Sequence, residues 1–126
     1  MEKRKNRRRK FSIYMCLWDH MTNKIVGHLS EIGEGGFKID SQSKVPVGLD
    51  YLLRIDLPRE VANKSMMIFN ARSKWCKPDK FDPSSFSAGF EIIDMGAGDQ
   101  EIFQRMFDQY SGPTSEKKED GGYLWK

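Results

Sequence analysis

The sequence lacks the long apolar runs of a membrane protein and the motifs of common enzyme classes. No stretch of its 126 residues approaches the roughly 18 apolar residues that span a bilayer. No apolar segment follows the basic N-terminus as it would in a signal peptide. Neither a Ser-His-Asp order nor a phosphate-binding Walker loop is present. We therefore expect a cytoplasmic protein that is not an enzyme.

Cysteine and histidine are also scarce, and their positions do not suggest a metal site. The two cysteines, Cys16 and Cys76, lie in separate strand-like runs, without a CxxC pair. His20 and His28 have no metal-ligand spacing with them. The pattern is typical of buried apolar thiols in a reducing compartment. We expect no metal and no cofactor.

Acidic residues are nearly absent from the first ten positions, which are strongly basic. The whole chain has a formal net charge of +3. Residues 1–10 contain seven Lys or Arg and only Glu2 as an acid, so the remainder is slightly acidic. A local basic patch of this kind favours an anionic partner such as a nucleotide, a nucleic acid or a membrane surface. A solvated terminus without a partner is the alternative.

The pattern of apolar residues indicates mainly β structure. Apolar and polar residues alternate with a period of two, and turn residues such as Pro46, Gly48 and Pro58 separate the runs. Six short antiparallel strands with such turns favour a small barrel or sandwich. The expected strands are Phe11–Leu17, Lys24–Ile32, Phe37–Asp40, Leu49–Leu57, Met66–Cys76 and Phe86–Ile93.

A helix is expected at the C-terminal end of the domain. Apolar residues recur at helical spacing from Ile102 to Tyr110, with Asp99 as the expected N-cap and Gly112-Pro113 as the stop. We expect this stripe to pack on the barrel. The predicted organisation is a flexible basic arm at 1–10, a domain at 11–111 with its helix at about 99–110, and a disordered tail at 112–126. The tail contains the apolar run 123–125, whose role is open.

A glycine-rich turn, Glu31-Ile32-Gly33-Glu34-Gly35-Gly36, follows the second expected strand. Its glycines would let the backbone approach a ligand closely and would permit positive φ angles. A carboxylate there can accept hydrogen bonds from guanine N1–H and the exocyclic amine. The arginine fork of the arm can bond guanine O6 and N7, or phosphate oxygens. The arm and the turn together suit a guanine nucleotide.

At this point the chain resembles the PilZ domain family, bacterial receptors for cyclic di-GMP. The resemblance covers roughly residues 3–110, because the other family segments follow in order. It implies a six-stranded β-barrel with a C-terminal helix, an N-terminal arm that wraps the ligand, and relay of the signal to an effector protein that the sequence does not identify. The matching segments after the turn are Val47-Gly48-Leu49, 53–58, Ala71-Arg72-Ser73-Lys74-Trp75 and 88–94.

Two family motifs carry ligand binding, and they imply the candidate site. The arm motif RxxxR is satisfied by Arg4 and Arg8, with Arg7 and Arg9 as substitutes. In many members the second arginine directly precedes the first strand, where this chain has Arg9 or Lys10.

The turn motif, D/N-x-S-x-x-G, departs from the family pattern. Glu31 stands where Asp or Asn is usual, Gly33 where Ser is usual, and Gly36 matches. The implied cyclic di-GMP site is therefore Arg4, Arg7, Arg8, Arg9, Glu31, Gly33 and Gly36.

Two alternatives remain open from the sequence. A PilZ-like interaction module that no longer binds cyclic di-GMP would explain the changes at Glu31 and Gly33. Alternatively, the arm could bind nucleic acid or an anionic membrane surface. Residues 1–10 contain no aromatic side chain for stacking on bases, so we do not expect a nucleic-acid partner.

Overall fold

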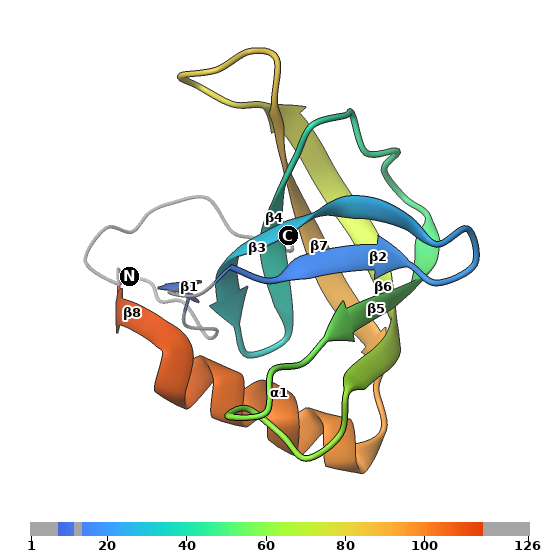
Figure 1. Cartoon of the computed structure of the whole chain (residues 1–126). Coiled ribbons are helices and arrows are strands. Elements are labelled where there is room, and N and C mark those ends of the chain that lie inside the picture. Colours follow the sequence, from blue (N-terminus) through green and yellow to red (C-terminus); the bar gives the residue numbers. More distant parts are fainter. Residues whose placement is uncertain (1–7, 12–13, 115–126) are drawn as a thin grey trace.

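The computed structural model describes the backbone of residues 8–11 and 14–114 and the side chains of residues 14–110. Strands dominate, and one helix follows the seventh strand (Figure 1). The elements are β1 (Arg8–Phe11), β2 (Cys16–Asp19), β3 (Lys24–Gly33), β4 (Gly36–Ser41), β5 (Asp50–Asp56), β6 (Met66–Pro78), β7 (Phe86–Asp94), α1 (Ala97–Tyr110) and β8 (Ser111–Thr114).

Six of the strands close into an antiparallel barrel. The sheet order is β2-β5-β6-β7-β4-β3-β1-β8, and β2 also pairs with β3. That additional pairing joins the two ends of the six-strand series, so the predicted six-stranded barrel with a C-terminal helix is confirmed. Strand β1 pairs with residues 31–33 at the end of β3, and β8 pairs in turn with β1, so these two strands extend the sheet outside the barrel.

The barrel interior is filled by inward-facing apolar side chains. Phe37 and Phe90 are fully buried and stack with ring centroids 5.4 Å apart, and Phe69 meets Phe37 edge-on. Such aromatic pairs add specific packing to the burial of their area. The alternation that predicted the strands therefore also determines which side chains form the core.

Helix α1 covers one end of the barrel, and the β6–β7 loop extends at the opposite end (Figure 1). Four residues of the predicted stripe are buried against the core: Ile102, Phe103, Met106 and Phe107. The expected packing of this helix on the barrel is therefore confirmed.

Several predicted boundaries were wrong. The first expected strand is split, because β1 ends at Phe11 and β2 begins at Cys16. The helix begins at Ala97, so Asp99 is not its N-cap. Asp99 instead lies in the first turn, where its carboxylate accepts a hydrogen bond of 2.7 Å from Lys64 Nζ. A negative charge is also favourable in this first turn.

The limits of the arm and of the tail also differ from the prediction. Residues 8–10 belong to β1 and residues 112–114 to β8, so both predicted segments begin or end inside strands. Strand β6 runs through Pro78, two residues past its predicted end. Cys16 and Cys76 are free thiols but only half-buried.

One glycine has a steric role that the sequence pattern did not reveal. A Cβ on Gly27 of β3 would overlap the backbone carbonyl oxygen of Asp40 on β4. The close approach of these two strands therefore requires a residue without a side chain.

Candidate functional site

The predicted turn connects β3 to β4. Strand β3 ends at Gly33 and β4 begins at Gly36, so Glu34 and Gly35 form the tip. The tip is tied to β7 because Ile92 N donates a hydrogen bond of 2.9 Å to Gly35 O. Gly33 and Gly36 are buried. The turn is thus a fixed part of the barrel.

The expected positive φ angles are not used at this turn. Among the glycines of the described residues, only Gly48 has a positive φ, of 82°. A Cβ on Gly35 would meet no atom within 4 Å. What the turn glycines provide is therefore a backbone without side chains, rather than a conformation that only glycine adopts.

The end of the basic arm lies directly beside this turn. Strand β1 pairs antiparallel with β3, and its register sets Arg8 opposite Gly33, Arg9 opposite Ile32 and Lys10 opposite Glu31. Two of the four candidate arginines are therefore backbone neighbours of the turn. Arg4 and Arg7 lie outside the described residues.

A β-bulge sets the direction of Glu31. Leu29 pairs with Ile39 and Glu31 with Lys38, which leaves Ser30 as the extra residue on β3. Leu29 and Ile32 are both buried although three positions separate them, which a regular strand cannot achieve. The bulge resolves this conflict and places Glu31 on the outer face.

Glu31 forms an ion pair with Lys38, a residue that the sequence analysis missed. Glu31 Oε2 lies 3.2 Å from Lys38 Nζ, and the two side chains are 20% and 24% exposed. The hydroxyl of Ser30 donates a hydrogen bond of 3.2 Å to Lys38 O. Lys38 lies between buried Phe37 and Ile39, so its outward direction could be predicted from the alternation in the sequence. Its pairing with Glu31 depends on the bulge and could not be predicted in this way.

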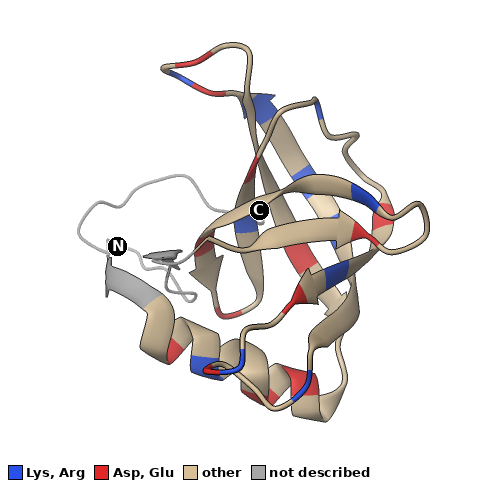
Figure 2. Ribbon diagram, in the orientation of Figure 1, with Lys and Arg blue, Asp and Glu red and all other residues tan. Residues whose placement is uncertain are grey.

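Further ion pairs lie on the strands that follow β4 around the barrel. Gly36 is register-paired with Glu91 of β7, and Lys74 Nζ lies 3.4 Å from Glu91 Oε1. Next along, Arg72 Nε donates a hydrogen bond of 2.6 Å to Asp50 Oδ1, and this bond lowers the pKa of Asp50. Acidic and basic residues are interspersed over the strands and α1 in the view of Figure 2.

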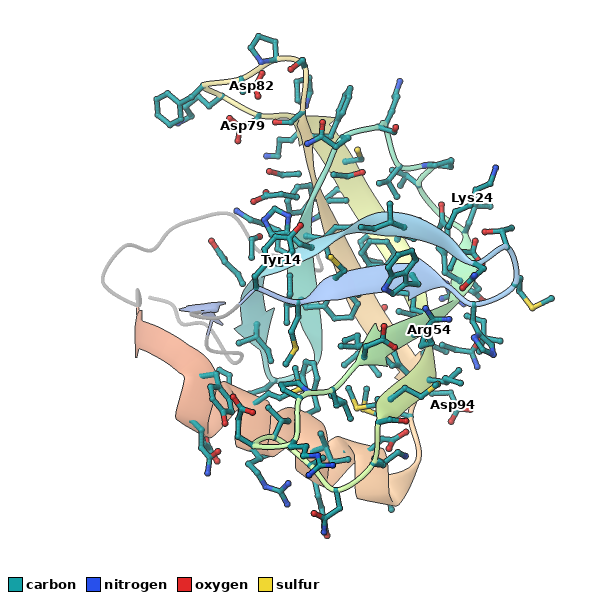
Figure 3. All side chains as sticks on the ribbon, in the orientation of Figure 1. Tyr14, Lys24, Arg54, Asp79, Asp82 and Asp94 are labelled. Atoms are coloured by element: carbon teal, nitrogen blue, oxygen red, sulfur yellow. The ribbon has the colours of Figure 1, made fainter. Side chains whose placement is uncertain are left out.

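Two of the hollows on the described surface differ in how they lie relative to the turn. One, of about 310 Å³, lies between the turn and the start of α1, with Glu34, Gly35 and Phe103 among its lining residues. The other, of about 460 Å³, is lined instead by the opposite part of the β3–β4 hairpin and by loop residues, including Tyr14 and Asp82 (Figure 3). Only the first adjoins the residues selected from the sequence.

The larger hollow is lined by several polar side chains. The Tyr14 and His28 rings lie 4.9 Å apart, and His28 Nε2 lies 3.6 Å from Asp40 Oδ2. Within the described residues, no group of three His, Cys, Asp or Glu side chains could hold a metal ion. Among the residues that the structure describes, no helix is long and apolar enough to cross a membrane.

Solved structures with the same architecture include two bacterial proteins. The PilZ domain of YcgR from Escherichia coli, solved with c-di-GMP, has a TM-score of 0.63 and 13% identity, covering 86% of this chain and 92% of that one. The chain has a PilZ-like fold. The Bacillus subtilis inhibitor of motility, MotI/DgrA, has a TM-score of 0.64 and 16% identity over 86% of this chain. No family model matches the sequence, and neither does any curated protein.

The PilZ-like chain spans about half of the MotI/DgrA structure, since the match covers 52% of that chain. The predicted resemblance is thus confirmed as a fold. Within that fold, one corner of the barrel brings together the backbones of Arg8 and Arg9 with Glu31, Gly33 and Gly36. The contribution of each to ligand binding stays a prediction.

Proposed function

We propose that this protein is a bacterial, cytoplasmic receptor for cyclic di-GMP that passes the signal to a protein partner. The observation that carries the proposal is the pairing of β1 with β3, which sets Arg8 opposite Gly33. The end of the basic arm and the turn, which were selected separately along the sequence, are backbone neighbours. The YcgR domain with the same fold was solved with c-di-GMP, which supports the choice of ligand.

Each part of the site has a chemical role in this proposal. Two arginines from Arg4, Arg7, Arg8 and Arg9 bind guanine O6 and N7 and the phosphate oxygens, because the guanidinium presents paired donors. The Glu31 carboxylate accepts hydrogen bonds from guanine N1–H and the exocyclic amine. The turn glycines let the nucleotide approach the backbone.

The substitution at Gly33 weakens binding without abolishing it. Replacing the family's usual serine removes one hydroxyl, and a neutral hydrogen bond contributes about 0.5–1.5 kcal/mol. The corresponding loss in affinity is a factor of about 2–13. Losing a contact from an arginine costs more, about 1.5–3 kcal/mol, because one partner is charged. The arm therefore decides whether the ligand binds.

Calorimetry with cyclic di-GMP, GTP and a short DNA duplex tests the proposal. We expect saturable heat with cyclic di-GMP but not with GTP or the DNA duplex. The double variant Arg4→Ala, Arg8→Ala should lose much of the affinity for cyclic di-GMP. A loss only for Arg7→Ala combined with Arg9→Ala would assign the contacts to those two residues. Arg59→Ala, an exposed arginine of the β5–β6 loop, is the matched control. Absence of heat with cyclic di-GMP up to about millimolar concentration would refute the proposal.

One observation favours a second function, a protein-interaction module that no longer binds the nucleotide. Glu31 already has a cationic partner in Lys38, so its carboxylate is satisfied without a ligand. Retention of an unidentified protein partner by a chain that gives no heat with cyclic di-GMP would support this function. Equal heats with all three anions, falling steeply with salt, would indicate nonspecific binding by the basic arm.

A further inference from the structure

The Glu31–Lys38 ion pair occupies the carboxylate that the proposed function assigns to guanine. We infer that Lys38 is a ligand-binding residue whose ammonium moves from Glu31 to a phosphate of cyclic di-GMP when the nucleotide binds. This inference rests on the proposed function and deepens it. The Lys38 Nζ and Glu31 Oε2 atoms lie 3.2 Å apart.

The position of Lys38 follows from the local strand geometry. Its neighbours Phe37 and Ile39 are fully buried, so Lys38 points to the outside of the barrel. The bulge at Ser30 brings Glu31 opposite Lys38 instead of opposite Phe37. A register without the bulge would turn Glu31 inward and leave Lys38 facing Ser30. The bulge therefore places the Glu31 carboxylate beside this cation.

Electrostatics favours a role for this cation in binding. Cyclic di-GMP carries two phosphate charges, and a carboxylate near them would repel the ligand. Both side chains are largely shielded from solvent, at 20% and 24% exposure, so this repulsion is less screened than at the open surface. Lys38 balances the charge of Glu31 in the free protein and balances a phosphate in the complex.

The surroundings of Lys38 allow the movement. On the side away from Glu31, its register partner on β7 is Gly89, which has no side chain. A lysine ammonium on a flexible four-carbon stem can change partner without movement of the backbone. Lys38 also offers a donor in place of the hydroxyl that Gly33 lacks. Glu31 then has all its acceptor positions free for the guanine edge.

Calorimetric titration of the full chain with cyclic di-GMP tests the inference. We expect Lys38→Met to weaken binding about tenfold or more, the usual effect of losing a bond between charged groups. Lys38→Arg keeps the charge and should bind within about threefold of the wild type. Lys24→Met makes the same chemical change at the opposite end of β3 and should bind like the wild type (Figure 3).

A double-mutant cycle separates phosphate binding from an indirect effect through Glu31. If Lys38 binds the ligand, Lys38→Met should cost at least as large a factor in the Glu31→Gln background as in the wild type, because Lys38 has no ion pair to give up there. A loss that disappears in that background would overturn the inference, because Lys38 would then only position Glu31. Unchanged or tighter binding by Lys38→Met would overturn it as well. A wild type that binds no cyclic di-GMP would instead overturn the proposed function, and the inference with it.

Discussion

Replacing Glu31 by glutamine tests the assigned guanine contact, because the change removes the charge and keeps the size of the side chain. The free protein loses the pair with Lys38, whose atoms lie 3.2 Å apart on side chains 20–24% exposed. A partly exposed pair contributes up to about 1 kcal/mol. For a domain of this length we expect the melting temperature to fall by no more than about 5 °C.

The effect on binding should be larger than the effect on stability. The charged hydrogen bonds to the guanine edge contribute about 1.5–3 kcal/mol. Up to about 1 kcal/mol of this is offset, because the wild type gives up the Lys38 pair when it binds. At the full offset the net loss is about 0.5–2 kcal/mol, which corresponds to about 2- to 30-fold weaker binding.

Calorimetry and a thermal melt on the same preparation measure both quantities. An affinity equal to that of the wild type, with the melting temperature lowered as expected, would contradict the reasoning. Glu31 would then serve only as the partner of Lys38. Glu34→Gln, three residues further along the chain and exposed, is the matched control and should change binding less.

Two further predictions concern stability. Gly27→Ala should lower the free energy of unfolding in urea by about 1–3 kcal/mol, because its Cβ would overlap a carbonyl oxygen of β4. Gly35→Ala has open space around its Cβ and should lower it much less. Equal losses in the two variants would be evidence against the steric argument. The hydrogen bond from Arg72 lowers the pKa of Asp50 from 3.8, so its stabilising contribution is present above pH 3.8 and is lost as the pH falls through the lowered pKa. Asp50→Asn should therefore flatten the pH dependence of the melting temperature below about pH 4, and an unchanged dependence would contradict this assignment.

The strand pattern could be predicted from the sequence because alternation directly records which residues face the core. It was reliable for β5 and β6, where long alternating runs contain the buried residues Leu53, Ile55, Met67 and Phe69. It was less reliable where the chain bends. The first strand was placed over 11–17, and the structure divides it into β1 and β2 because each pairs with a different part of β3.

The sequence located the turn, but not the residue that pairs with Glu31. The resemblance to the family's turn motif singled out Glu31, Gly33 and Gly36, whose role in binding stays a prediction. The pairing of Lys38 with Glu31 requires the bulge at Ser30, and bulges leave little signal in a single sequence. One signal was present: Leu29 and Ile32 are both apolar, three residues apart within one strand, which regular alternation does not allow.

Amide NMR shifts during titration with cyclic di-GMP test most directly the claim that the nucleotide lies between the arm and the turn. The account predicts saturable shifts for Arg8 and Gly33, which the pairing of β1 with β3 brings together, and for Gly36 at the start of β4. It predicts no shift for Gly48, in the loop between β4 and β5. The absence of shifts, or shifts confined to the hollow beside Tyr14, would contradict the account.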